Sequence, residues 1–251
     1  MTPIVVVSYN IHRGVGLDLR LDLDRIAAII TETRADVVAL QEVVRDPGGM
    51  HTDQAESLAQ ALGMTLVMGD ARAWGEGTYG NAVLTRLPVL GTARCDLSHG
   101  AREPRGALRV DVAAGDRPVR VFNAHFGLAF RERRAQVELL GRFLCAGGGG
   151  GPRVLLGDFN EWHPGPVTRR LRREFRSPRR RLRRTHPAPF PLFKLDRIYW
   201  DAELEADELR VHQSRLARVA SDHLPVVAHL RLRRESPVIP WVTGDALRPA
   251  E

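Results

Sequence analysis

Polar and ionisable residues stand at the ends of several strand-like runs of the sequence. The β-branched run at residues 4–9 leads into Asn10, and the apolar run at residues 36–40 leads into Gln41 and Glu42. The whole set of such residues is Asn10, Glu42, His125, Asp158, Asn160, Asp196, Asp222 and His223. A single Asp after a strand is most often a turn former or a cap. Because strand ends can meet at one rim of a sheet, the complete set indicates a site assembled from distant parts of the chain.

The side-chain types in this set favour a hard divalent cation. Carboxylates and asparagines dominate it, beside two histidines and no thiolate. Oxygen donors of this kind suit Mg²⁺ or Mn²⁺ better than zinc. The two cysteines, Cys95 and Cys145, are not spaced as zinc ligands and cannot build a disulfide framework. The sequence therefore predicts Mg²⁺, or Mn²⁺, as the cofactor.

Seven short segments carry a family resemblance. They are Ser8-Tyr9-Asn10-Ile11-His12, Leu40-Gln41-Glu42-Val43, Gly80-Asn81-Ala82-Val83-Leu84, Asn123-Ala124-His125-Phe126, Gly157-Asp158-Phe159-Asn160, Leu195-Asp196-Arg197-Ile198 and Ser221-Asp222-His223-Leu224-Pro225-Val226. Their order and approximate spacing resemble those of the endonuclease/exonuclease/phosphatase superfamily, which includes deoxyribonuclease I, the abasic-site endonucleases, sphingomyelinases and inositol polyphosphate 5-phosphatases. The segments span residues 8–226, nearly the whole chain.

The resemblance implies an α/β fold and a metal site. The expected fold is the four-layer α/β sandwich of deoxyribonuclease I, in which two packed mixed β-sheets are flanked by helices. The resemblance makes Glu42 the principal metal ligand, with Asn10 and Asp222 close to the same cation or to its waters. The metal would neutralise the phosphate so that an anionic nucleophile can approach in line.

The resemblance also implies roles for five further residues. Asp158 would orient and deprotonate the attacking water, and Asn160 would donate to the nucleophile or to the phosphoryl oxygens. His223 would contact the scissile phosphate, held in tautomer and orientation by Asp196. His125 would be a second imidazole that faces the phosphate, where it would stabilise charge or protonate the leaving oxygen.

Two arginines are candidate phosphate ligands. The Arg-Glu-Pro-Arg segment that contains Arg102 and Arg105 resembles the Arg-Glu-Pro segment of deoxyribonuclease I, in which the arginine approaches the substrate phosphates. The alternative is a surface turn fixed by Pro104 in an arginine-rich protein.

One position departs from the deoxyribonuclease I pattern. In that enzyme a glutamate pairs with the first catalytic histidine, whereas the nearest match in this chain is Tyr79 or Asn81. A role for His125 as a strong general acid is therefore open. We expect Asn81 to support the site by hydrogen bonding, among the residues that face the substrate phosphate.

The positive charge of the chain is concentrated in one segment. The formal net charge is +7, and Lys194 is the only lysine. Residues Arg169 to Arg184 include ten arginines and one acid, a local net charge of +9, which leaves −2 for the rest. This arginine block could follow a nucleic-acid backbone or an anionic bilayer, or it could be a solvated surface.

The elements that must position these residues alternate between strands and helices. A β-α-β opening is expected at residues 4–40, with its helix at 22–33, and further helices at 52–62, 131–145 and 168–175. The remaining expected strands are 65–68, 81–85, 107–112, 119–124, 154–156, 196–200 and 225–230, with a hairpin at Gly115-Asp116. The glycine run at 147–151 precedes a strand and lacks the Gly-Lys-Ser/Thr ending of a phosphate loop, so it is expected to be a connector.

We expect one catalytic domain at residues 1–234 and a C-terminal tail at 235–251, because no linker long enough to separate two domains is evident. Neither a run of about 20 apolar residues nor a signal peptide is recognisable, which predicts a cytoplasmic protein without a transmembrane segment. A monomer is expected.

The leading prediction for function is a divalent-metal-dependent phosphodiester hydrolase, nuclease-like on DNA or RNA. The first alternative is a phosphodiesterase or phosphatase directed at phospholipids or phosphoinositides, because the chain also resembles a bacterial subgroup of uncharacterised family members, some associated with lipid-synthesis genes. The third is a catalytically silent module that binds a polyanion, against which the complete residue set argues.

Overall fold

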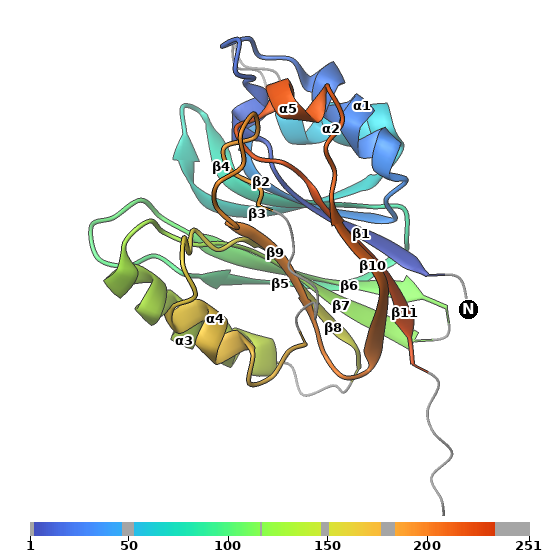
Figure 1. Ribbon diagram of the computed structural model, residues 1–251, viewed down its shortest axis with the longest axis vertical. Helices are drawn as coiled ribbons and strands as arrows, with labels where there is room; N and C mark the ends of the chain where they lie inside the picture. The colour runs from blue at the N-terminus through green and yellow to red at the C-terminus, as the bar shows by residue number, and fades with distance from the viewer. Residues whose placement is uncertain (1–2, 47–52, 116, 147–150, 177–183, 234–251) are drawn as a thin grey trace, which may run out of the picture.

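Two β-sheets packed face to face form the centre of the molecule, and helices cover the outer face of each (Figure 1). The computed structural model describes residues 3–46, 53–115, 117–146, 151–176 and 184–233. Both sheets are mixed, because β1 pairs with β2 and β7 pairs with β8 in parallel, while the other neighbours are antiparallel. The predicted four-layer α/β sandwich of the deoxyribonuclease I type is therefore confirmed.

The strands follow a simple order within each sheet. The six-stranded sheet, in the order β10-β11-β1-β2-β4-β3, contains β1 (Ile4–Asn10), β2 (Val37–Arg45), β3 (Thr65–Trp74), β4 (Gly77–Thr85), β10 (Leu204–Val211) and β11 (Val226–Leu232). The five-stranded sheet, in the order β5-β6-β7-β8-β9, contains β5 (Val89–Asp96), β6 (Gly106–Ala114), β7 (Arg117–His125), β8 (Arg153–Asp158) and β9 (Asp196–Trp200).

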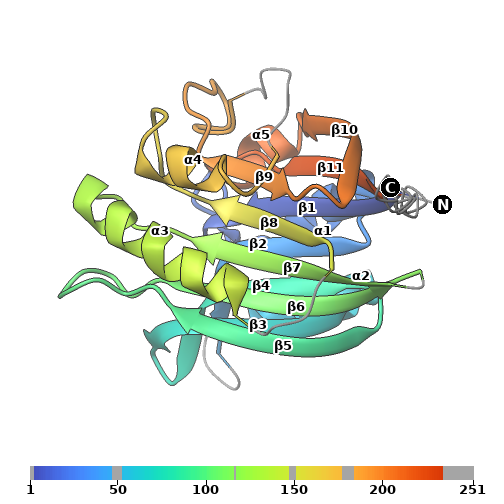
Figure 2. The same cartoon turned by 90° about the horizontal axis from the view of Figure 1, so that it is seen from below.

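The helices lie in two groups. On the six-stranded sheet lie α1 (Leu23–Thr33), α2 (Gln54–Leu62) and α5 (Ala217–Ala220), and a short 3₁₀ turn, η1 (His12–Gly14), follows β1 (Figure 1). On the other sheet lie α3 (Phe130–Cys145) and α4 (Pro166–Leu171), and Figure 2 shows both across its outer face. Among the described residues, no helix is long and apolar enough to cross a membrane.

The alternation of side chains along β7 shows how the core positions a site. Phe122 and Ala124 belong to the cluster packed under α3 and α4, whereas Val121 belongs to the cluster that fills the space between the sheets. Because side chains alternate between the two faces of a strand, Asn123 and His125 also point toward the other sheet. Asn123 is fully buried there and bonds across to β2 and β4. His125, at the end of the strand, reaches the rim.

Most expected elements are confirmed within one or two residues. The β-α-β opening is β1, α1 and β2, with the Asp22 side chain capping α1 by accepting from Arg25 N at 3.0 Å. Gly63 ends α2 in the left-handed conformation, at φ 59°. The hairpin at 115–116 joins β6 to β7, although Asp116 itself lies outside the described residues. The same is true of most of the glycine run and of the proposed tail at 235–251.

Two strands were not predicted, and four elements differ from their expected bounds by more than two residues. Of these, β2 ends at Arg45 and not at 40, β3 ends at Trp74 and not at 68, and β4 begins at Gly77 and not at 81. The unpredicted strands β5 and β10 are edge strands, and the alternating half-burial of β5 leaves only a weak apolar signal in its sequence. The helix expected at 168–175 instead occupies 166–171. It begins early because Pro166 suits the first helical position and because Glu161 accepts from the free N–H groups of Val167 and Thr168, both at 3.0 Å.

Gly157 should be irreplaceable in β8. Its φ is 148°, and a Cβ atom there would lie 1.8 Å from the carbonyl oxygen of Ala124 on β7. We expect Gly157→Ala to lower the free energy of unfolding by more than about 3 kcal/mol, measured by urea denaturation. Gly91→Ala in the same sheet is the matched control, since its nearest contact would be at 3.5 Å. Equal unfolding midpoints for the two variants would contradict this account.

Candidate active site

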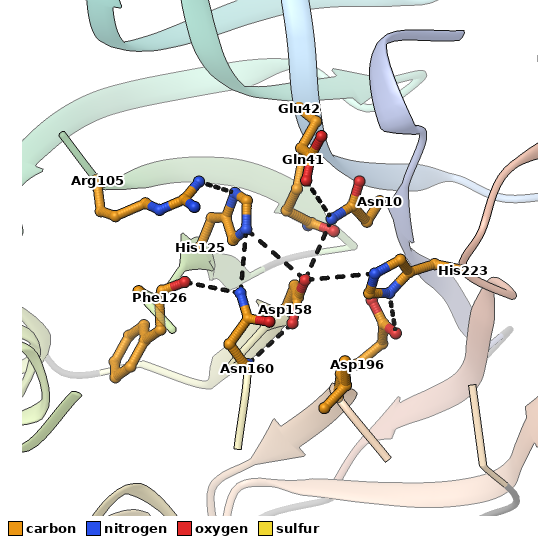
Figure 3. Close-up of polar contacts among 12 residues, drawn as sticks. Asn10, Gln41, Glu42, Arg105, His125, Phe126, Asp158, Asn160, Asp196 and His223 are labelled. Carbon is orange, nitrogen blue, oxygen red and sulfur yellow. Dashed lines mark hydrogen bonds and ion pairs between the residues drawn. The ribbon is translucent and has the colours of Figure 1, made fainter. Parts of the chain in front are cut away.

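The carboxylate of Asp158 lies at the centre of the polar cluster at the rim (Figure 3). The residue is 1% exposed. Its Oδ2 accepts from Asn10 Nδ2 at 3.1 Å, and its Oδ1 accepts from the backbone N–H of Asn160 at 2.9 Å. The Nε2 atoms of His125 and His223 lie 3.7 and 3.8 Å from Oδ2. Five of the residues predicted from the sequence thus meet at one carboxylate.

Strand register explains much of this convergence. In the parallel pairing of β7 with β8, His125 stands opposite Asp158. In the antiparallel pairing of β8 with β9, Asp158 stands opposite Asp196. Three of the candidate residues therefore lie side by side across three neighbouring strands. Asn10 reaches the same point from the end of β1 in the other sheet.

An irregularity in β2 aims Glu42 at this point. The register with β4 shifts between Leu40 and Val43, and Glu42 has a φ of 59°, which is uncommon for a residue with a side chain. Glu42 Oε1 accepts from Asn10 Nδ2 at 3.1 Å, so one amide group contacts the carboxylates of both Glu42 and Asp158. Gln41 points between the sheets instead, where it donates to Asn123 at 2.8 Å. The positive φ of Glu42 thus lets the consecutive side chains of Gln41 and Glu42 point in different directions.

His223 and Asp196 form the expected imidazole–carboxylate pair. His223 Nδ1 lies 2.8 Å from Asp196 Oδ2, and both residues are buried. Burial alone would lower the pKa of His223, but the carboxylates of Asp196 and Asp158 outweigh it and raise that pKa to about 10. Burial in turn raises the pKa of the Asp158 carboxyl to about 6, although the charge on His223 opposes the shift. The pair presents a positively charged imidazole beside Asp158.

His125 has the opposite electrostatic environment. Its Nδ1 lies 3.1 Å from Nη1 of Arg105, a residue that is only 7% exposed. Burial and the Arg105 charge hold the pKa of His125 well below its usual range, and the charge of His223 adds to the effect. The partner of this histidine is therefore Arg105, where the sequence offered Tyr79 or Asn81. Asn81 instead donates to the carbonyl of Gly106 at 2.8 Å, which ties β4 to the start of β6.

Arg102 and Asp222 lie further out. The Arg102 side chain is 57% exposed, with Nε 3.9 Å from a carboxylate oxygen of Glu132. Asp222 lies against two histidines, with oxygens 3.6 Å from His186 Nε2 and 4.0 Å from His12 Nδ1. Burial would raise the pKa of Asp222, but His186, His223 and His12 together lower it to about 2.

His12 and His186 were assigned no role from the sequence. The His186 ring lies 4.7 Å from the His223 ring, centroid to centroid. Its loop is held at the site because the N–H of Ala188 donates to the carbonyl of Asp222 at 2.7 Å. His12 could have been noticed, since it follows Asn10 by two residues and its N–H donates to Asn10 Oδ1 at 3.0 Å. No comparable local signal marks His186.

The donor set fits a hard divalent cation. Carboxylates of Glu42 and Asp158 are held together by the Asn10 amide, and the buried Asp196 Oδ1 has no hydrogen-bond partner. Two groups of possible ligands lie within 4.8 Å among the described residues, namely Asp158, Asp196 and His223, and His186, Asp222 and His223. Asn10 presents its nitrogen to the carboxylates, because its oxygen accepts from His12. It is therefore placed to orient Glu42.

A second buried hydrogen-bond network, centred on Glu161, lies beside the site. Glu161 is 1% exposed and accepts from Val167 N, Thr168 N and Arg197 Nη1, each at 3.0 Å. It also accepts from the Thr168 hydroxyl. Because Arg197 follows Asp196 directly, Glu161 connects α4 to the strand that carries the partner of His223.

Comparisons with known proteins give a family match and relatives of similar sequence. The profile of the Endonuclease/Exonuclease/phosphatase family matches residues 7–223. YbhP of Escherichia coli strain K12, described as an uncharacterized protein, is 32% identical over 243 residues, which cover 90% of this chain and 96% of YbhP.

Two solved structures show the same fold at low identity. The mannosyl-6-phosphatase Bt3783 of Bacteroides thetaiotaomicron has a TM-score of 0.74 and 20% identity, over 91% of this chain and 100% of that one. TDP2 of D. rerio, in complex with a single-stranded DNA product, has a TM-score of 0.73 and 15% identity, over 92% and 100%.

Glu161→Gln should destabilise the protein in a pH-dependent way. Burial would raise the pKa of Glu161, but Thr168 and Arg197 lower it, so the charged form stabilises the fold above the unfolded pKa of about 4.3. We expect the variant to lose about 2–3 kcal/mol at pH 7, and the difference from the parent to shrink as the pH falls below about 4.3. Urea unfolding at several pH values measures this, with exposed Glu76→Gln as control. A loss that is independent of pH would contradict the charge argument.

Proposed function

Because the chain belongs to the endonuclease/exonuclease/phosphatase family, we propose that it is a divalent-metal-dependent phosphodiester hydrolase, nuclease-like on DNA or RNA. The observation that carries the proposal is the buried Asp158 carboxylate, which meets Asn10, Asn160 and two imidazoles at one point. A general base, donors for a phosphoryl group and oxygen ligands for a cation are thus within reach of one phosphate.

The proposed reaction is in-line attack of a water molecule on the phosphorus. Asp158 accepts the proton of that water, and its raised pKa of about 6 makes it a better base than an exposed carboxylate. Asn160 and His223 donate hydrogen bonds to the nucleophile and the phosphoryl oxygens. Asp196 keeps the His223 ring in orientation through the 2.8 Å contact.

Glu42 is the residue proposed to hold the cation, with Asn10 fixing its direction and Asp222 at the periphery. When bound, Mg²⁺ or Mn²⁺ supplies neutralisation of phosphate charge. The oxygen-rich set around Glu42 and Asp158 is the support for this choice of ion.

Aromatic and cationic groups near the site favour a nucleic-acid strand. Trp162, which is 54% exposed, follows Asn160 by two residues and contacts the Phe193 ring at 4.6 Å. The Arg72 guanidinium lies 4.7 Å from the Trp74 ring and 4.4 Å from the Tyr79 ring. Bases of single strands stack on exposed aromatics such as Trp162, while arginines meet the backbone. We further propose that the protein acts as a cytoplasmic monomer.

Exposed apolar side chains favour the lipid alternative. Leu19 is 86% exposed, Phe190 is 80% exposed and Leu192 is 56% exposed. The last two lie on the loop between His186 and Phe193, beside the site. A phospholipid or phosphoinositide substrate would bring such side chains into contact with a bilayer surface. The silent binding module is disfavoured because the residues for chemistry are all present.

A substrate panel tests the proposal. The protein is incubated with single-stranded DNA, plasmid, RNA, phospholipid vesicles and bis-p-nitrophenyl phosphate, with Mg²⁺, Mn²⁺ or EDTA. We expect nucleic-acid cleavage that requires the metal, and a loss of kcat of about 10²–10⁴-fold in Asp158→Asn and in His223→Asn, because each removes a group that moves or holds a proton. Circular dichroism checks that the variants fold, and His229→Gln, on β11, is the matched control.

Cleavage of vesicles alone would select the lipid alternative. Binding of nucleic acid without cleavage under any metal condition would select the silent module. Full activity in Asp158→Asn would refute the assignment of the base.

The arginine block gives a separate prediction. Arg169, Arg172 and Arg173 are exposed on and after α4, whereas residues 177–183 lie outside the described residues. If the block follows a single strand, changing these three arginines to Gln should weaken binding of single-stranded DNA and reduce the slope of log K against log salt by roughly 2, at about 0.7 per phosphate contact. Fluorescence anisotropy across a salt series measures the slope.

The matched control changes three exposed arginines elsewhere, Arg86, Arg142 and Arg231, which removes the same net charge. An equal slope in both triple variants would identify the block as a solvated surface.

A further inference from the structure

Arg105 reaches the catalytic cluster through the His125 ring (Figure 3). Its Nη1 lies 3.1 Å from His125 Nδ1, and its Nη2 donates to Glu103 Oε2 at 2.8 Å. Arg105 is 7% exposed and His125 is 4% exposed, so water does not compete for this contact. A buried arginine that uses one nitrogen on a histidine and the other on a carboxylate is held in a fixed position.

The direction of the hydrogen bond decides the tautomer of His125. A guanidinium is always protonated in proteins and has only donors. It can bond to His125 Nδ1 only if that atom offers its lone pair. The single ring hydrogen of a neutral imidazole must then be on Nε2.

The Nε2 atom points into the centre of the site. It lies 3.7 Å from Asp158 Oδ2, an acceptor, and 3.4 Å from Asn160 Nδ2. The Asn160 amide already donates to the carbonyl of Phe126 at 2.8 Å, so its longer contact with the ring is the weaker one. The charged Arg105, at 3.1 Å from Nδ1, is a stronger donor than the neutral Asn160 amide at 3.4 Å from Nε2. Arg105 therefore decides the tautomer of His125.

Charged and polar groups face His125 from several elements. Arg105 and Glu103 face it from the segment before β6, Asp158 and Asn160 from β8 and its end, and His223 from the segment before β11. Arg72, 3.5 Å from Glu103, stands behind Arg105 and shares that carboxylate. Because Glu103 is shared between two arginines, it does not cancel the positive charge beside the ring.

We propose that Arg105 is a positioning residue that fixes His125 as a neutral Nε2–H donor aimed at a phosphoryl oxygen of the substrate. His125 then stabilises the charge that develops on the phosphate by hydrogen bonding and keeps its proton throughout. The leaving oxygen, released when its P–O bond breaks, takes its proton from solvent water. The inference rests on the proposed function, and it gives Arg105 a role through His125 in place of direct phosphate binding.

The tautomer is tested without substrate. Long-range ¹H–¹⁵N spectra of the histidine rings, assigned with His125→Gln, show which ring nitrogen carries hydrogen. We expect His125 of the parent protein to carry it on Nε2 at pH 8 and to remain neutral at about pH 6, below the ordinary histidine pKa of about 6.5. Arg105→Met should allow the Nδ1–H form and proton uptake, whereas Arg105→Lys should retain the parent tautomer. Arg120→Met, on β7, is matched in burial at 8% exposed and should leave His125 unchanged.

Kinetics on bis-p-nitrophenyl phosphate separate positioning from binding. For a positioning role, Arg105→Met should lower kcat about 10–100-fold with little change in KM, add an inflection near pH 6 to 7, and be largely rescued in Arg105→Lys. A raised KM with unchanged kcat, or Nδ1–H in the parent protein, would overturn the proposal. If no phosphodiester is cleaved by any form, the proposed function fails, yet the parent spectra still decide the tautomer.

Discussion

The rest of the site depends on the contacts that surround the buried carboxylate of Asp158. Removing a charge from water is costly unless hydrogen bonds and counter-charges replace the water. Here the replacements come from both sheets, since Asn10 donates from β1 while the Asn160 N–H and the two imidazoles approach from the other elements. The face-to-face packing of the sheets therefore does more than fill a core, because it brings donors from one sheet to an acceptor on the other.

This arrangement gives two histidines different electrostatic states within one cluster. His223 lies against Asp196 and Asp158 and has a raised pKa, while His125 lies against Arg105 and has a lowered one. When the environments of two groups move their pKa values apart, one group can be charged and the other neutral at the same pH, so that each can take a different role in a reaction. The charged ring can attract a phosphate, and the neutral ring can donate a hydrogen bond of fixed direction.

Several residues with uncommon backbone angles lie around the same carboxylate. Glu42 and Asn160 have positive φ without being glycine, at 59° and 46°, and Gly157 has a φ of 148°. These conformations let consecutive residues point in different directions, so that Gln41 joins the sheets while Glu42 faces the site. Such strain persists only where surrounding contacts fix it, and it is a feature of functional sites rather than of cores.

The sequence by itself indicated the alternation of strands and helices and the strand-end residues, because buried apolar runs and the polar residues that end them are local signals, as at residues 4–10 and 154–160. The expectation of four layers came from the family resemblance of seven short segments. It missed the edge strands β5 and β10, whose half-exposed faces carry little apolar pattern. Only the tertiary structure decided that Arg105 faces His125 and that His186 reaches Asp222. These contacts join residues 20 and 36 positions apart, and packing between elements fixes them, so no local pattern could reveal them.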